Sequence, residues 1–162
     1  MRKITPNLWF DTQAEEAARF YVSIFPNSNI NAVTHYTPEI AKAARMPEGT
    51  VLTVSFVLDG NPFLALNGGP IFKFSEAVSF IVECKDQREI DFYWDRLTAE
   101  GGQPGQCGWL KDRFGLSWQV VPEGIDRMMT DPDPEKSRRA GAAVMGMKKI
   151  DLAALTRAYE GK

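Results

Sequence analysis

Apolar and polar side chains alternate along residues 107–122 in a way that is typical of a β-hairpin. Leu116, Trp118 and Val120 fall on one face of an extended chain, while the other face carries a hydroxyl and an amide. The segment 112–115 between the two extended runs starts with an aspartate and ends with a glycine, which suits a tight turn. We therefore predict strand, turn and strand, with one face buried and the polar face lining a cleft.

The first half of the chain shows the pattern of a βαβββ unit. Strand patterns occupy residues 4–10, 29–37, 50–58 and 63–67. A helix is expected after the first strand, with Thr12 as its N-cap, Glu15 as the capping-box partner and a stop at Pro26. Residues 38–49 are expected to form a loop with a short helical turn.

The second half repeats this order. Strand patterns occupy residues 77–84 and 106–111, and the hairpin described above supplies the last strand. The helix between them has Asp86 as its predicted N-cap, with Glu89 three residues later, and it ends before Gly101. The repeated order favours an internal duplication.

Beyond Pro122 the apolar spacing becomes helical. Two helices are expected, one from about residue 134 to 147 and one from 152 to 159, the second capped by Asp151. Their apolar stripes can pack on the sheets or on a second subunit. The predicted fold is thus α+β, with modules at 1–70 and 71–122 and a helical C-terminal extension at 123–162, all within one structural domain.

Composition narrows the classes of partner. The 162 residues carry a net charge of −2, with 44% hydrophobic and 25% charged residues, which is ordinary for a globular protein and gives no reason to expect nucleic acid. No apolar run reaches transmembrane length, and the first residues lack a signal-peptide core. The two cysteines, Cys84 and Cys107, are then expected to be free thiols in a reducing compartment. We predict a cytoplasmic protein without a membrane partner.

Several segments resemble one family closely. The βαβββ pair resembles the vicinal oxygen chelate superfamily of glyoxalases, bleomycin-resistance proteins and dioxygenases, and more narrowly its PhnB-like branch, often labelled 3-demethylubiquinone 3-methyltransferase. The resemblance covers about residues 3–122 and is carried by Phe20-Tyr21, Ile24-Phe25, Asn67-Gly68-Gly69-Pro70, Phe72-Lys73-Phe74, Ala77-Val78-Ser79-Phe80 and the stretch 107–122. It implies a homodimer and a divalent metal between the two modules.

The metal ligands that the resemblance implies do not have the usual chemistry here. The first-strand positions fall on Thr5 and on either Ala77 or Ser79. The last-strand positions fall on Asn67 and on Gln119, and at the second of these relatives commonly have Glu. Amides and hydroxyls are poor sole ligands for a transition metal. The single histidine, His35, lies on the second strand, away from these positions. We therefore predict no bound metal and no cofactor.

Alternation assigns a set of neutral hydrogen-bonding and aromatic residues to the cleft. The candidate ligand-binding residues are Asn7, Trp9, Asn67, Ser79, Trp109, Ser117 and Gln119, with Thr53 and Ser55 on the same side of module one. Such groups suit recognition of a planar or amphipathic small molecule, and none of them titrates near neutral pH. The alternative is that they only solvate an open sheet face.

The two cysteines and the charged residues of the hairpin turn have structural rather than catalytic interpretations. Cys107 has no histidine nearby in the sequence and is expected to be a small apolar filler, while Cys84 is a core candidate. Asp112 and Arg113 are interpreted as a turn-opening aspartate and a solvated arginine. The methyltransferase label has little support, because no Gly-rich turn follows a leading strand of a parallel sheet.

Three hypotheses follow for function. The leading one is a metal-free superfamily member that binds a small aromatic or amphipathic molecule in the cleft between its modules. The second is an enzyme, either a metal-dependent lyase, dioxygenase or isomerase or a 3-demethylubiquinone 3-methyltransferase-like protein. The third is a structural or regulatory dimer without a ligand. The catalytic residues, if any, and the identity of the ligand are not predicted.

Overall fold

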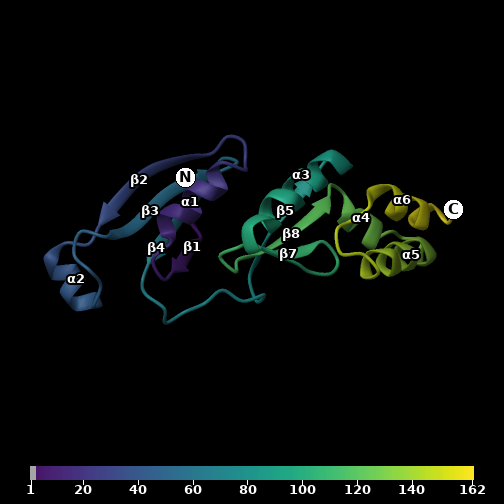
Figure 1. The fold of residues 1–162 in the computed structure, drawn as a ribbon. Helices are drawn as coiled ribbons and strands as arrows, with labels where there is room; N and C mark the ends of the chain where they lie inside the picture. Colours follow the sequence, from purple (N-terminus) through teal and green to yellow (C-terminus); the bar gives the residue numbers. More distant parts are fainter. Residues whose placement is uncertain (1–2) are drawn as a thin grey trace. The chain divides into compact units, whose positions relative to one another are not determined.

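The β-strands form two separate four-stranded sheets, one in each half of the chain (Figure 1). The computed structural model describes residues 3–162, and these divide into a first unit that ends at Lys73 and a second from Phe74 to Lys162. The four-stranded sheets with their helices confirm the predicted α+β class.

Module one, in the first unit, is a mixed sheet with a helix on one face. Its elements are β1 (Asn7–Phe10), α1 (Ala14–Val22), β2 (Asn29–His35), α2 (Pro38–Ala44), β3 (Val51–Leu58) and β4 (Asn61–Asn67). The strand order is β1-β4-β3-β2, in which β1 runs parallel to β4 and the other pairs are antiparallel. The side of α1 that faces the sheet is fully buried, and Tyr21 stacks on Phe56 with ring centroids 6.5 Å apart.

The start of module one differs from the prediction. The strand begins at Asn7 rather than residue 4, because Pro6 has no N–H for the ladder, although its carbonyl still accepts from Leu64 N. The predicted N-cap Thr12 is also wrong. Helix α1 begins at Ala14 after Gln13, which makes no side-chain cap, and Ala14 N–H donates instead to a side chain of β4.

Module two repeats the strand order of module one. Its elements are β5 (Ser79–Cys84), α3 (Gln87–Thr98), a 3₁₀ turn (Ala99–Gly101), β6 (Gln103–Pro104), β7 (Trp109–Lys111) and β8 (Ser117–Pro122). The order β5-β8-β7-β6, with β5 parallel to β8, matches that of the first sheet and agrees with the predicted duplication. The predicted cap is confirmed, because Asp86 Oδ1 accepts from Glu89 N at 3.0 Å.

The strand predicted at 106–111 is shorter than expected and starts at Trp109. Cys107 and Gly108 adopt positive φ values of 59° and 81°, so the chain bends there. Their N–H groups donate to the carbonyls of Met147 and Lys148 at 2.7 and 2.8 Å. The C-terminal extension therefore satisfies the two N–H groups, while the Gly108 carbonyl accepts from Val120 N of the neighbouring strand at 2.8 Å.

The C-terminal extension packs on module two within the second unit. It contains α4 (Ile125–Met129), α5 (Pro134–Met145) and α6 (Leu152–Glu160), of which α4 was not expected from the sequence. Ala140, Val144, Ile150 and Leu155 form its buried centre, and Cys107 of module two packs against them. Asp151 caps α6 as predicted, accepting from Ala154 N at 2.8 Å.

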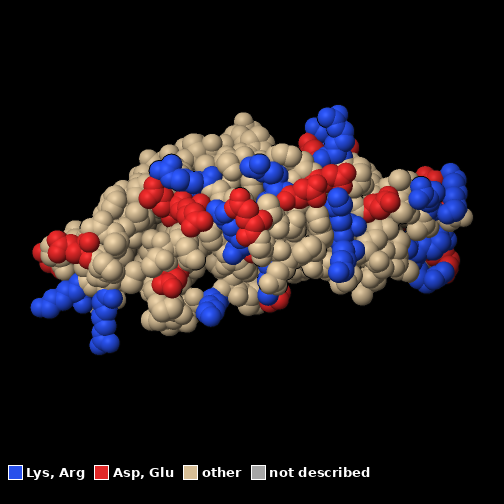
Figure 2. Space-filling model, in the orientation of Figure 1, with Lys and Arg blue, Asp and Glu red and all other residues tan. Residues whose placement is uncertain are grey.

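Charged residues are mixed in sign over the surface. On the face seen in Figure 2, lysine and arginine side chains alternate with acidic ones rather than gathering into one large area. Within the part of the chain that the structure describes, no helix is both long and apolar enough to cross a membrane. Compartment stays a prediction.

Candidate ligand-binding site

Four of the predicted ligand-binding residues share one face of the module-two sheet. The strand register places Ser117 beside Ser79 and Lys111, and it places Gln119 beside Ile81 and Trp109. We call this surface the polar face of module two, formed by Ser79, Ile81, Gln103, Trp109, Lys111, Ser117 and Gln119. The opposite face carries the buried Leu110, Trp118 and Val120 and packs under α3 (Figure 1).

The turn that fixes this face is built around a buried carboxylate. Asp112 is 2% exposed, and its Oδ1 accepts from the backbone N–H groups of Phe114 at 2.9 Å and Leu116 at 3.1 Å. Its Oδ2 accepts from Trp118 Nε1 at 2.9 Å. The turn interpretation of Asp112 is confirmed. Arg113, in contrast, is not solvated, because it forms an ion pair with Glu100 and lies over the Phe114 ring.

Ser117 carries a buried hydroxyl that the protein leaves unpaired. The residue is 1% exposed, and its Oγ makes no hydrogen bond to any group within residues 3–162. A serine hydroxyl can donate one hydrogen bond and accept two, and burying it without a partner costs free energy. Such a group is therefore a candidate contact for a bound molecule.

A hollow of about 180 Å³ adjoins this hydroxyl. It is lined by Glu76, Gln103, Pro104, Gly105, Trp109, Leu110, Lys111 and Ser117. Lys111 Nζ lies 2.6 Å from Glu76 Oε1, an ion pair that joins β7 to the segment before β5 across the intervening β8. The hydrogen bond from Lys111 is the main reason that the pKa of Glu76 is lowered from its ordinary value. The hollow thus combines an indole, an ammonium group and a free hydroxyl.

The other two polar residues of this face hold each other. Gln119 Nε2 donates to Ser79 Oγ at 2.9 Å, which links β8 to β5. This bond uses one of the two donor positions of the amide and leaves its carbonyl oxygen available. Gln119 and Ser79 therefore present a fixed polar pair next to Trp109.

Asn67 does not lie on the cleft side of module one. It is paired with Phe10 in the register and so shares the buried face under α1, at 3% exposure. Its Oδ1 accepts from Ala14 N at 2.8 Å and its Nδ2 donates to Val51 O at 3.0 Å. The prediction that Asn67 shares a face with Thr53 and Ser55 is wrong, because the register pairs those two residues with Leu66 and Leu64. Asn67 is the cap that Thr12 was expected to provide.

Trp9 and Asn7 do share a face with Thr53 and Ser55, as predicted. The Trp9 indole N–H donates to Gly69 O at 2.9 Å, and its ring covers Gly68, where an added Cβ would lie 2.1 Å from the ring. Trp9 also meets Phe72 edge-on, with ring centroids 5.0 Å apart. Trp9 therefore fixes the 68–69 loop, and only its ring surface is left for a ligand.

The positions implied for a metal do not fit a transition-metal ion. Thr5 precedes β1, Asn67 is bound to backbone groups, and Ser79 and Gln119 are bound to each other. His35 is exposed on β2. Within residues 3–162, no three His, Cys, Asp or Glu side chains gather as a metal site. The donor set is neutral, and transition metals favour imidazole, thiolate or carboxylate.

The two thiols have packing roles. Burial is the largest cause that raises the pKa of Cys84 to about 12, so this thiol stays protonated and is a poor nucleophile near neutral pH. Cys107 is half-buried against the tail, with Sγ 3.6 Å from Met145 Sδ. These contacts agree with the interpretation of Cys107 as a filler.

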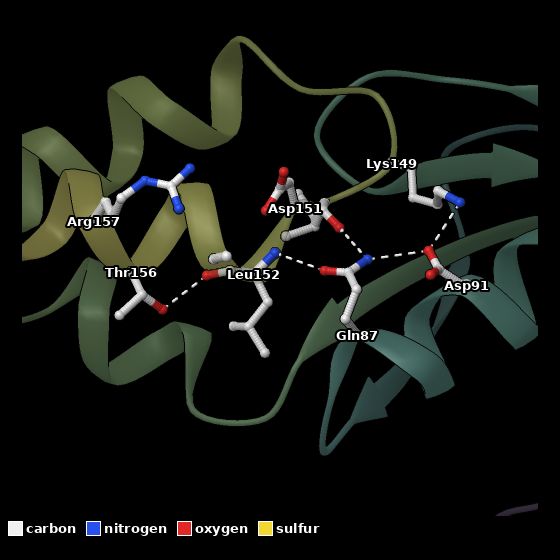
Figure 3. Close-up of a pocket in the computed structure, with 9 residues that line it drawn as sticks. Gln87, Asp91, Lys149, Asp151, Leu152, Thr156 and Arg157 are labelled. Carbon is white, nitrogen blue, oxygen red and sulfur yellow. Dashed lines mark hydrogen bonds and ion pairs between the residues drawn. The ribbon is translucent and has the colours of Figure 1, made fainter.

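A larger hollow of about 720 Å³ lies where α3 meets the tail (Figure 3). Gln87 Nε2 donates to Asp91 Oδ1 and Ile150 O, both at 3.1 Å, and its Oε1 accepts from Leu152 N at 2.8 Å. Lys149 Nζ pairs with Asp91 Oδ1 at 2.8 Å, and Figure 3 shows these side chains turned toward one another. The polar groups that line this hollow hold the C-terminal extension against α3. We therefore interpret the hollow as part of the interface between these two elements.

Sequence reasoning missed the charged part of the site. Lys111 lies opposite Ser117, a register that follows from the predicted turn and that could have placed its side chain on the polar face. Glu76 lies in a segment without regular structure, so no periodicity could have brought it to Lys111.

Comparisons with known proteins identify the class of this architecture. Two βαβββ modules with these sheets define the fold of the vicinal oxygen chelate superfamily. More narrowly, the chain belongs to the family described as 3-demethylubiquinone-9 3-methyltransferase, whose model matches residues 2–121. This family match confirms the PhnB-like resemblance.

Solved structures support the same conclusion. A PhnB protein from Bacillus cereus, titled a putative 3-demethylubiquinone-9 3-methyltransferase, is 32% identical, with a TM-score of 0.66 over 75% of this chain and 99% of its own. Protein PA1353 from Pseudomonas aeruginosa is 20% identical, with a TM-score of 0.61 over 76% and 98% of the two chains. The fosfomycin resistance protein FosX from Listeria monocytogenes shares the fold at 12% identity, with a TM-score of 0.54 over 78% and 94%. No curated protein matches the chain.

Proposed function

We propose that this protein binds a small aromatic or amphipathic molecule on the polar face of module two, without a bound metal. The unpaired Ser117 hydroxyl beside a hollow of about 180 Å³ is the observation that carries the proposal. Trp109 offers a planar apolar surface at the same place, and the Gln119–Ser79 pair offers a fixed hydrogen-bonding edge. The ring of Trp9 and the arrangement of both modules around one cleft stay predictions.

The enzymatic alternatives receive less support from these residues. A metal-dependent lyase, dioxygenase or isomerase needs anionic or imidazole ligands, and the implied positions supply amides and hydroxyls. A methyltransferase that acts on a hydroxyl group needs a base to accept its proton. Glu76 is the carboxylate that lines the hollow, and the hydrogen bond from Lys111 lowers its pKa, which makes it a weaker base.

We also propose a homodimer, as the family resemblance implies. Within residues 71–81, four large apolar side chains are more than half exposed and provide the support: Ile71, Phe72, Val78 and Ile81. Exposed apolar residues that gather into a patch mark protein interfaces. Light scattering on a sizing column is expected to give twice the mass of one chain, and a monomer at micromolar concentration would contradict this part of the proposal.

Fluorine NMR of protein labelled with 5-fluorotryptophan tests the binding proposal. The four tryptophans report on separate places, because the buried Trp94 and Trp118 lie on α3 and on the face of β8 beneath it, Trp9 is in module one and Trp109 lines the hollow. Titration with benzamide and benzoate is expected to move the Trp109 resonance and to leave those of Trp94 and Trp118 in place. The resonances are assigned with single Trp→Phe variants.

A matched pair of variants controls this titration. Gln119→Leu removes the polar edge of the face and is expected to weaken binding of benzamide, while Gln106→Leu changes an exposed glutamine before β7 and is expected to have no effect. If neither probe moves Trp109 at any concentration up to its solubility, the proposal is wrong.

A further inference from the structure

One carboxylate of the protein itself, that of Glu76, already lies in the hollow on the polar face. Glu76 Oε1 lies 2.6 Å from Lys111 Nζ, and the Glu76 side chain is 63% exposed whereas that of Lys111 is 33% exposed. Glu76 comes from the irregular segment before β5, so no helix or strand holds it in place. The ammonium group thus comes from β7, and its partner is the more exposed of the two and lies outside the sheet.

Ser117 lies next to this ion pair but takes no part in it. The register puts Ser117 on β8 directly beside Lys111 on β7, and both residues line the hollow. Its hydroxyl is buried and without a partner within residues 3–162. A carboxylate accepts hydrogen bonds at two oxygens, so an anion at Lys111 can also accept one from Ser117.

From this geometry we infer that the ligand is an aromatic carboxylate, whose anionic group displaces Glu76 from Lys111 and accepts a hydrogen bond from Ser117 Oγ. The inference rests on the binding function proposed above and adds the charge of the ligand to it. Trp109 covers the ring of the ligand, and the volume of about 180 Å³ suits a compound with a single ring. Glu76 acts as an internal competitor that occupies Lys111 until the ligand arrives.

The competition has a predictable magnitude. An ion pair that is this exposed contributes little, so its removal is expected to change an equilibrium constant by at most about fivefold. Glu76→Gln removes the competing charge and is therefore expected to tighten benzoate binding about two- to fivefold. Benzamide has no charge, so its affinity is expected to stay the same in this variant.

The test measures dissociation constants for benzoate, benzamide and phenylphosphonate by the shift of the Trp109 fluorine resonance. The proteins are the unaltered chain, Glu76→Gln, Lys111→Met and the control Lys85→Met, which removes an ammonium group from the Lys85–Glu89 pair at the start of α3. We expect Lys111→Met to weaken benzoate about tenfold and to leave benzamide unchanged. We expect Lys85→Met to change neither.

The possible outcomes separate this inference from the proposed function. Benzoate that binds more tightly than benzamide, with opposite effects of the Glu76 and Lys111 variants, supports the inference. Equal binding of benzoate and benzamide in every variant overturns it and leaves the proposed function standing. Phenylphosphonate that binds more tightly than benzoate overturns the carboxylate assignment. If none of the three probes moves Trp109 in any variant, both the inference and the proposed function are wrong.

Discussion

The last strands of the two modules treat a buried polar side chain in opposite ways. Asn67 on β4 is 3% exposed, and both atoms of its amide bind backbone groups of module one. Ser117 on β8 is 1% exposed, yet its hydroxyl has no partner within residues 3–162. A buried polar group lowers stability unless it is hydrogen-bonded. We take the contrast to mean that Asn67 serves the fold and Ser117 serves a ligand.

Module two meets its own structural needs with a different residue. Asp112 accepts three hydrogen bonds within the hairpin, so the turn does not depend on Ser117 or Gln119. Ser117 and Gln119 on β8 are therefore not required for the structural hydrogen bonding that Asn67 provides in module one. The identity of a side chain that the fold does not need can be set by the ligand that it binds.

The largest effect is expected from Asp112→Ala, which tests whether this carboxylate is the structural group of module two. Three donors lose their acceptor, two of them on the backbone, and the free energy of unfolding is expected to fall by about 4 kcal/mol. Urea unfolding followed at the Trp118 fluorine resonance measures the change. Asp95→Ala, at an exposed position on α3, is the control and is expected to change stability by less than about 0.5 kcal/mol.

Asn67→Ala gives the next largest effect and tests the structural half of the comparison. The buried Ala14 N and the half-buried Val51 O lose their partners, so the free energy of unfolding of module one is expected to fall by about 3 kcal/mol. The Trp9 resonance in urea reports on this module, and Asn7→Ala on the exposed edge of β1 serves as control. A loss below about 1 kcal/mol would mean that the amide contributes little to the fold.

Ser117→Ala has the smallest effect on stability and the opposite sign. Removal of an unpaired buried hydroxyl leaves no donor or acceptor without a partner, so the free energy of unfolding is expected to rise by up to about 1 kcal/mol. Benzoate binding to the same variant is expected to weaken. Stability that falls by more than about 1 kcal/mol would show that the hydroxyl supports the fold, and the contrast with Asn67 would then disappear.

The sequence was sufficient to predict most of the fold, because its strongest signals are local. Alternation along β3 and the cap at Asp86 each depend on a few consecutive residues, and the structure confirms them, whereas β8 is buried on both faces except at Gln119. The turn at residues 112–115 was predicted for the same reason. Where a contact between distant residues decides the outcome, local patterns were insufficient. The start of α1, set by Asn67 from β4, is one example.

The candidate site was predicted only in its neutral part. Parity placed Ser79, Ser117 and Gln119 on one face of module two, which the register confirms. It could not reveal that Ser117 lacks a partner, because that depends on every group around it. Nor could it reveal that the loop residue Glu76 reaches Lys111. The sequence predicts which side chains share a face, and the structure shows which of them are already used.

Native mass spectrometry of the purified protein with benzoate, in the presence and absence of a chelator, tests the central claim most directly. We expect a chain that carries no divalent cation and that forms the same fraction of benzoate complex in both samples. One divalent cation per chain, together with loss of the benzoate complex on chelation, would contradict it. That result would show that the site holds a metal, and it would favour a metal-dependent enzyme over the metal-free binding function.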